Sequence, residues 1–370
     1  MNRFLTTIAL LTLSVGQAHA DVVWPVAGPY SGSSASIGMG QLEGIKQAVA
    51  DINAAGGIKG QKIVLKTYDD ACDPKQAVSV ANKIVADGFR FALHGTCSGA
   101  SLAAERVYLE EDVVVINAFS SNPKWTDEGG PTIFRANYRD NMAAGVVSDA
   151  IRKRYPRAKV AILHDKSSFG QRIAEDVRDR LNKAGMKEVL FDSYAPNDRD
   201  FSALVTRLKD IGAGVVFVGG YPVEIGLIAR QMREAGLSSH LFAGDLSVPE
   251  FWKISGSAGE GALFAFPPDP RKDPVARGVL ETIERSGVVV DGHAIYGYAA
   301  AQVLAQAMNT AGDTDPKSLA DTLHKAEFKT VLGPWRFDSK GDIRNMYEVL
   351  YRWHNGKFLE DADAPHPVEK

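Results

Sequence analysis

The chain has 370 residues, and its 42 lysines and arginines nearly balance 45 aspartates and glutamates, for a net charge of −3. Both signs are interspersed without a basic stripe, which argues against nucleic acid and anionic lipid surfaces as partners. The composition is that of an ordinary globular protein. The length exceeds what a single hydrophobic core usually supports, so we expect two domains.

The N-terminus has the pattern of a secretory signal. Arg3 precedes an uncharged run over residues 4–15, and residues 17–20 place small side chains at the two positions that a signal peptidase reads. The run is too short to cross a bilayer, which needs about 20 apolar residues. We expect cleavage before Asp21 and a periplasmic mature protein. Residue 21 is not a cysteine that could carry a lipid, and no later segment has a membrane-spanning pattern, so we expect no direct membrane anchor.

Secondary structure is predicted to alternate between strand and helix almost throughout. Short β-branched runs separated by amphipathic helices indicate parallel strands covered on both faces. The sequence therefore predicts an α/β fold of two doubly wound, Rossmann-like units. The strands are expected at 22–27, 63–66, 91–94, 113–116, 160–164 and 215–218, and the helices at 42–55, 74–85, from about 101, 173–181 and 225–232.

The two cysteines, Cys72 and Cys97, suit an exported protein. In an oxidising compartment a lone pair favours a structural disulfide that closes a modest loop. A metal site or a catalytic thiol is the alternative, although a metal site would want further ligands at metal spacing and none is nearby.

Loops that follow the predicted strands are candidates for ligand binding, because ligands of open parallel sheets sit beyond the carboxyl ends of the strands. These loops are rich in Ser, Gly, Tyr and Asp. Hydroxyls and helix N-termini suit a carboxylate, and a carboxylate side chain suits an ammonium group, so a small zwitterion fits. The loops are 28–37, 95–98 and 117–122 in the first unit and 165–169, 219–221 and 244–247 in the second.

Motifs for chemistry are missing from the sequence. There is no phosphate-binding GxxxxGK[ST] loop, no HExxH pair and no complete dinucleotide fingerprint. Residues 95–99 carry Cys97 where a nucleophile elbow needs its serine. We expect neither an enzyme nor a bound cofactor or metal.

Two segments carry a specific resemblance, ADINAAGGIKG at 50–60 and YDDACDPKQAV at 68–78. With HDK at 164–166, FG at 169–170 and GGY at 219–221, the chain resembles the leucine/isoleucine/valine-binding protein family along essentially its whole mature length. Members of that family are the substrate-binding components of branched-chain amino-acid ABC transporters. The resemblance implies a type I periplasmic-binding-protein fold, with two lobes joined by a multi-strand hinge. After a signal peptide at 1–20, one lobe would hold 21–139 and 268–350, and the other 140–267 and 351–370.

The resemblance also implies roles for individual residues. Ser98 would bind the α-carboxylate of an amino acid, and Ser121, usually Thr in the family, would serve both carboxylate and ammonium. The carbonyl of Phe119 would accept from the ammonium, Tyr221 would reach the carboxylate from the second lobe, and Asp245 would face the ammonium. A Cys72–Cys97 bridge matches a disulfide of some members and would fix the loop that carries Ser98.

Several positions depart from the family pattern and bear on specificity. Ile37 replaces an aromatic residue, Phe119 replaces a small one, Phe169 keeps an aromatic ring without a hydroxyl, and Asp245 is one methylene shorter than the glutamate of some relatives. The same cavity is expected to include Thr96, His293 and Tyr296. Small neutral amino acids and γ-amino acids are therefore candidates beside the branched-chain ones.

The predicted function is the capture of a small amino acid and its delivery to the permease of an ABC transporter. The alternative is a ligand-sensing module of the same fold that signals to a membrane receptor.

Overall fold

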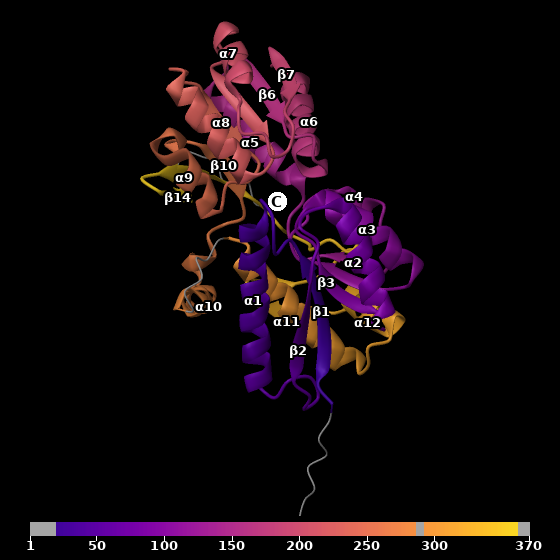
Figure 1. Ribbon diagram of the computed structural model, residues 1–370. Helices are drawn as coiled ribbons and strands as arrows, with labels where there is room; N and C mark the ends of the chain where they lie inside the picture. Colours follow the sequence, from indigo (N-terminus) through magenta and orange to yellow (C-terminus); the bar gives the residue numbers. More distant parts are fainter. Residues whose placement is uncertain (1–19, 286–291, 362–370) are drawn as a thin grey trace, which may run out of the picture.

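The computed structural model describes residues 20–285 and 292–361, in which two separate sheets organise the chain (Figure 1). The predicted signal peptide, residues 1–20, lies outside the described residues except for Ala20. The first sheet is parallel throughout and has the strand order β2-β1-β3-β4-β5. Its strands are β1 (Val22–Gly28), β2 (Ile63–Asp69), β3 (Phe91–His94), β4 (Val114–Asn117) and β5 (Ile133–Arg135).

Helices cover both faces of this first sheet. Trp24 and Val26 of β1 belong to a core cluster that also holds Leu42 of α1 (Ala35–Ala54) and Ile295 of α11 (Ala294–Ala311). Ala27, the residue after Val26, belongs to a second cluster, with residues of α2 (Pro74–Ala86) and α3 (Ser98–Glu110). Successive side chains of one strand thus enter different cores, as the period of two requires. The remaining elements of this half are α4 (Lys124–Asp127), α10 (Pro274–Arg285), α12 (Pro316–Lys325) and the hairpin of β11 (Phe328–Thr330) and β12 (Gly333–Trp335).

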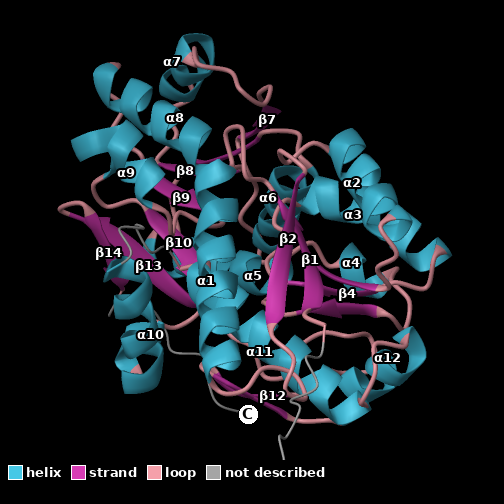
Figure 2. Ribbon diagram, turned by 60° about the horizontal axis from the view of Figure 1, so that its bottom comes forward, coloured by secondary structure: helices cyan, strands magenta, loops and turns pink. Residues whose placement is uncertain are grey.

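The second sheet has the order β14-β13-β10-β9-β8-β6-β7 and lies apart from the first (Figure 2). β13 and β14 are antiparallel, whereas the other five strands run parallel. The sequence did not predict this antiparallel edge. The strands are β6 (Val160–His164), β7 (Leu190–Ser193), β8 (Val215–Gly219), β9 (His240–Ala243), β10 (Leu263–Phe266), β13 (Val349–His354) and β14 (Lys357–Glu360).

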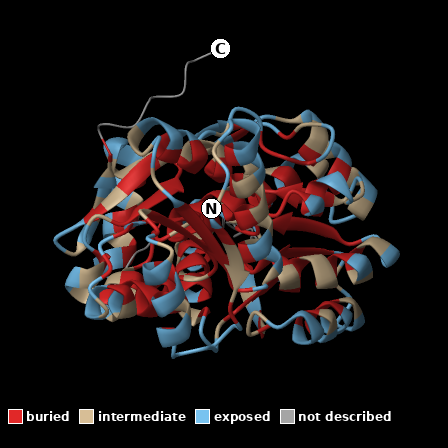
Figure 3. Cartoon of the chain, turned by 90° about the horizontal axis from the view of Figure 1, so that it is seen from above, coloured by how far each residue is buried: buried red, intermediate tan, exposed pale blue. Residues whose placement is uncertain are grey.

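Both faces of the second sheet are covered as well. On one face, Ile162 of β6 belongs to a cluster with Val147 of α5 (Asp140–Arg154) and Val177 of α6 (Ser168–Lys183). On the other face, its neighbour Leu163 belongs to a different cluster, which holds Ile228 of α8 (Pro222–Glu234). Figure 3 shows the strands of both sheets as buried between exposed helical faces. The predicted doubly wound α/β architecture is confirmed. The helices are α5 (Asp140–Arg154), α6 (Ser168–Lys183), α7 (Ser202–Asp210), α8 (Pro222–Glu234) and α9 (Pro249–Ser255), with 3₁₀ turns η1 (Gly256–Gly259) and η2 (Pro270–Lys272).

The chain passes between the two halves three times. It leaves the first sheet between β5 and α5, returns between β10 and α10, and crosses again between β12 and β13. α11 therefore packs beside α1 although more than two hundred residues separate them (Figure 1). None of the described helices is both long and apolar enough to span a membrane.

Three predicted helices differ where they bear on ligand binding. Those expected at 42–55 and 173–181 begin at Ala35 and Ser168, so Ile37 and Phe169 lie in helices and not in loops. The helix expected from about residue 101 begins at Ser98, because Cys97 has extended backbone angles and acts as the N-cap. Ser98 consequently stands in the first helical turn, where backbone N–H groups have no partner within the helix.

Candidate ligand-binding site

A cavity lies between the two halves, and segments that follow strands of both sheets contribute to its walls. Each of the six loops that the sequence analysis proposed supplies at least one lining residue. The polar lining residues are Thr96, Ser98, Ser121, Tyr221, Asp245 and His293, and the others are Ile37, Phe119, Tyr138, Phe169, Gly220 and Pro222.

Ser98 brings a hydroxyl to the cavity at the N-terminus of α3. Its side chain is buried, and Ser120 Oγ donates to Ser98 Oγ at 3.3 Å. The unpaired N–H groups and the positive end of the helix dipole favour a negative charge here. This wall of the cavity is suited to a carboxylate.

The loop after β4 is held in place from beneath. Asn117 Oδ1 accepts the backbone N–H groups of Phe119 at 3.0 Å and of Ser120 at 2.6 Å. The buried guanidinium of Arg135 donates to the carbonyls of Ser120 and Asn122 at 2.6 and 2.8 Å. These bonds flank Ser121 on both sides, so its hydroxyl is presented from a fixed backbone.

The ring of Phe119 forms a wall of the cavity and is anchored in an aromatic cluster. Its centroid lies 3.9 Å from that of His293, 5.6 Å from Tyr138 and 5.9 Å from Tyr296. Aromatic rings in such edge-to-face contacts interact favourably beyond their buried area. Phe119 is therefore a rigid boundary of the space that a ligand side chain can occupy.

The opposite wall comes from the second sheet. Tyr221 is the N-cap of α8, and its ring lies 5.5 Å from that of Phe169. Burial raises the pKa of the Tyr221 phenol well above its usual value, with nearby Asp165 adding to the effect. The phenol therefore keeps its proton and can donate a hydrogen bond into the cavity.

Asp245 is the one carboxylate among the lining residues. Its Oδ1 accepts the backbone N–H of Ser247 at 2.7 Å, and its Oδ2 lies 3.2 Å from His293 Nε2. With α3 and its hydroxyls on one side and this carboxylate on another, the cavity is suited to a molecule with one negative and one positive group.

The structure brings together nine of the ten predicted site residues. Tyr296 is the exception: its ring lies behind Phe119 and stacks on Trp335 at 6.3 Å. Sequence reasoning missed three lining residues. Gly220 and Pro222 flank Tyr221 and could have been inferred from it, whereas Tyr138 lies in the first crossing between the halves, which no local pattern marks.

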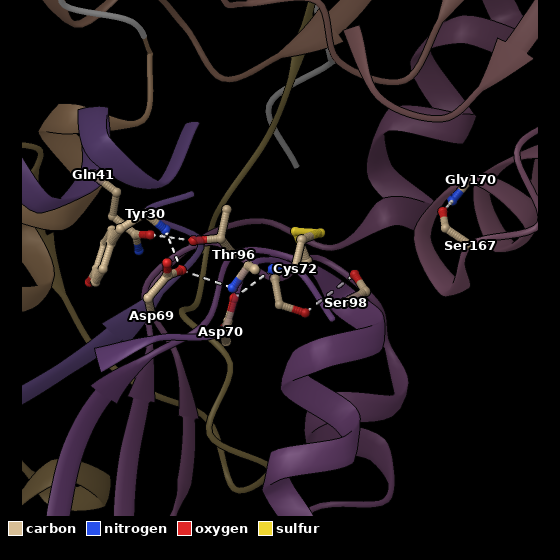
Figure 4. The surroundings of a disulfide bond; sticks show 12 residues. Tyr30, Gln41, Asp69, Asp70, Cys72, Thr96, Ser98, Ser167 and Gly170 are labelled. Atoms are coloured by element: carbon tan, nitrogen blue, oxygen red, sulfur yellow. Dashed lines mark hydrogen bonds between the residues drawn. A yellow bond between two sulfur atoms is a disulfide. The ribbon is translucent and has the colours of Figure 1, made fainter. Parts of the chain in front are cut away.

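The predicted disulfide between Cys72 and Cys97 is present, with Cα atoms 5.5 Å apart (Figure 4). Over the described residues there is no free cysteine and no group of three or more His, Cys, Asp or Glu side chains placed to hold a metal ion.

Comparison with known proteins identifies the family. Residues 24–357 match the periplasmic binding protein family. The chain belongs to that family. It is 39% identical over 343 residues to Leu/Ile/Val-binding protein homolog 1 of Brucella suis, and 41% identical over 348 residues to an amino acid binding protein of Pseudomonas aeruginosa, covering 92% of both chains in each comparison.

Solved structures share the fold of this periplasmic binding protein. A leucine binding protein from Thermotoga maritima superimposes with a TM-score of 0.84 at 24% identity, over 92% of this chain and 98% of that one. The family and these relatives consist of solute-binding proteins and not of enzymes.

Proposed function

We propose that this protein binds a small zwitterionic amino acid in the cavity between its halves and delivers it to the permease of an ABC transporter in the inner membrane. The observation that carries the proposal is the placement of a single carboxylate, Asp245, in the same small cavity as Ser98 at the N-terminus of α3. The names of the relatives from Brucella suis and Pseudomonas aeruginosa, which refer to amino-acid binding, support it.

In this proposal the ligand carboxylate accepts from Ser98, Ser121 and Tyr221, and its ammonium donates to Asp245 and the Phe119 carbonyl. Thr96, Ile37, Phe169 and His293 bound the remaining space. Charge-assisted hydrogen bonds of this kind are about twice as strong as neutral ones, and burial strengthens them further. In this function no covalent bond of the ligand is formed or broken.

Closure of one lobe onto the other would trap the ligand. The lobes follow the predicted division, residues 21–139 with 268–350 and residues 140–267 with 351–370, except that Val349 and Leu350 lie in β13 of the second sheet. The three crossings serve as the hinge. Asn122 Nδ2 donates to the carbonyl of Ser168 across the cleft at 2.9 Å, a contact that supports a closed arrangement. As part of this proposal, the signal peptide at residues 1–20 is removed and the mature protein works in the periplasm.

The proposal is tested by calorimetric titration of signal-free protein that has been unfolded and refolded to remove bound ligand. The panel is the neutral amino acids and γ-aminobutyrate. Tight binding of leucine, isoleucine or valine means that Ile37 and Phe119 leave room for a branched side chain. Binding of smaller or γ-amino ligands alone means that these side chains narrow the specificity. Failure of the whole panel would contradict the proposal.

A further inference from the structure

Three buried polar side chains form a hydrogen-bonded row beneath the loop that carries the disulfide. Tyr108 Oη lies 2.7 Å from His94 Nδ1, and His94 Nε2 lies 3.0 Å from Asp70 Oδ2. All three are at most 2% exposed. Burying an ionisable group without partners costs several kcal/mol, so a buried row of this kind needs each member to be satisfied. We call these three residues the Asp70 relay.

The contacts of the relay allow every member a hydrogen-bond partner. Burial raises the pKa of the Tyr108 phenol well above its usual value, and the neighbouring Asp70 adds to the effect, so the phenol keeps its proton. In the tautomer of neutral His94 that carries its hydrogen on Nε2, Tyr108 donates to His94 Nδ1 and His94 Nε2 donates to Asp70. Every polar atom of the row therefore has a defined role.

The relay ends on a backbone that would otherwise be strained. Asp70 Oδ1 accepts the N–H of Cys72 at 2.8 Å, and Asp69 Oδ1 accepts the N–H of Ala71 at 2.9 Å (Figure 4). Ala71 and Cys72 both have positive φ, 49° and 62°. Residues with a Cβ adopt this left-handed region at a cost, and such conformations persist only where surrounding bonds impose them.

The disulfide carries this constraint to the cavity. Cys72 is bonded to Cys97, the N-cap of α3, and Ser98 follows directly. Tyr108 lies in the same helix, so the relay and the disulfide join α3 to the β2 and β3 ends at two points along its length. On the other side, Thr96 Oγ1 donates to Gln41 Oε1 at 2.5 Å, and Gln41 Nε2 donates to the Gly95 carbonyl at 3.2 Å. Ser98 is thus held from two directions.

We propose that Asp70 and His94 are positioning residues for carboxylate recognition: through Cys72 and Cys97 they set the orientation of the first turn of α3 and of Ser98. This inference rests on the proposed function, in which Ser98 binds the ligand carboxylate. Neither residue lines the cavity, so both act through Ser98 and not by contact with the ligand.

The test compares carboxylate and carboxamide forms of the same ligands. Wild type and His94→Leu are titrated with leucine, alanine and γ-aminobutyrate and with leucinamide, alaninamide and 4-aminobutanamide. His94→Leu is expected to weaken the acids at least tenfold and the amides much less, because a displaced Ser98 loses a charge-assisted bond to the carboxylate and only a weaker neutral bond to the amide carbonyl. His94→Gln, whose amide can still donate to Asp70, is expected to restore most of the affinity.

Ser101→Ala is the matched control. It lies in the same helix, is equally buried, and its hydroxyl has no hydrogen-bond partner among the described residues. It should leave the ratio of acid to amide affinity unchanged. A Cys72→Ser/Cys97→Ser background removes the connection through Cys72 and leaves the one through Tyr108. In that background the difference in acid affinity between His94→Leu and His94→Gln should become smaller. If His94→Leu does not fold, the same comparison of acid and amide affinities is made with Tyr108→Phe and Asp70→Asn.

Acid and amide affinities that fall in equal proportion, or an acid affinity that does not change, would overturn the positioning role while leaving the proposed function intact. A wild type that binds no member of the panel of neutral amino acids and γ-aminobutyrate would instead contradict the proposed function. The two failures are therefore separable within one set of titrations.

Discussion

Asp245 is the residue on which the charge balance of the site depends. Its carboxylate is oriented by the N–H of Ser247 and by His293, and both contacts leave it facing the cavity. A fixed carboxylate loses little rotamer freedom when a ligand ammonium arrives, so most of the interaction energy contributes to affinity.

We predict that Asp245→Ala weakens binding of the ligand by about 2–5 kcal/mol, the usual cost of leaving a buried charge without its partner. Asp245→Asn should lose most of the same amount, since the amide keeps the shape and loses the charge. Calorimetric titration measures both effects. Asp210→Ala, at the exposed end of α7, serves as control, and an unchanged dissociation constant for Asp245→Ala would remove this residue from the site.

The pairing of α1 with α11 places residues of two distant segments on the same cavity. Gly44 lies where the two helices approach most closely, because a Cβ added there would stand 1.8 Å from the carbonyl oxygen of Ala294. α1 carries Ile37, and His293 is the N-cap of α11, so this contact sets the distance between two lining residues.

Gly44→Ala should therefore lower the free energy of unfolding by about 1–3 kcal/mol, the usual cost of overpacking, and weaken ligand binding at the same time. Gly278→Ala is the matched control. It lies in the exposed face of helix α10 with nothing near an added Cβ, and it should stabilise the protein by roughly 0.5–1 kcal/mol. Urea unfolding distinguishes the two. Equal effects of the two variants would show that the close approach does not matter.

The disulfide loop is the other element whose integrity can be measured. Cys72 and Cys97 are 25 residues apart, and a chain-entropy treatment credits a loop of this length with about 3–4 kcal/mol. The Cys72→Ser/Cys97→Ser variant should show a lower melting temperature, followed by circular dichroism. The variant should bind the amino acids in nearly the same order of preference as wild type, because the main effect of the bridge is expected on stability. If preference changed while the melting temperature held, the bridge would act on the cavity and not on stability.

The whole molecule holds several carboxyl groups whose burial disfavours charge. Burial raises the pKa of Asp140, at the start of α5 beside Ser121, from 3.8 to about 7, although the Ser121 hydroxyl and Arg135 lower it in part. Burial likewise raises the pKa of Glu348, in the third crossing between the halves. A carboxyl with a raised pKa favours the folded state when it is protonated. This contribution is complete when the pH is below the pKa that the carboxyl group has in the unfolded chain. It is lost as the pH rises through the pKa of the same group in the folded protein.

We predict that the free energy of unfolding of Asp140→Asn rises relative to that of wild type between about pH 4 and pH 7. At about 1.4 kcal/mol per unit of pKa, the upper bound of this relative change is about 4 kcal/mol. Other carboxylates titrate in the same range, so the difference between the two proteins is the quantity to follow, by urea unfolding at each pH. A difference that is constant with pH would contradict the protonation of Asp140 in the folded state.

Local patterns were sufficient for the elements of the central parallel strands and for most of the loops that form the site. The strands at 91–94 and 160–164 coincide with β3 and β6, because buried parallel strands are short continuous apolar runs that need no distant information. The rule that ligands lie beyond the carboxyl ends of parallel strands then located six segments that line the cavity, although not those that carry Tyr138 and His293. The disulfide followed from compartment and cysteine count.

Only the tertiary structure decided how those loops meet. The antiparallel strands β13 and β14, the contact of Asp245 with His293, and the anchoring of Phe119 among Tyr138 and Tyr296 join segments that are far apart in the chain. Periodicity reports which face of an element is buried, and it carries no information about which partner buries that face. The sequence by itself therefore determined the elements, the disulfide and the kind of chemistry, whereas the packing of the two halves determined which side chains share one cavity and how much room they leave.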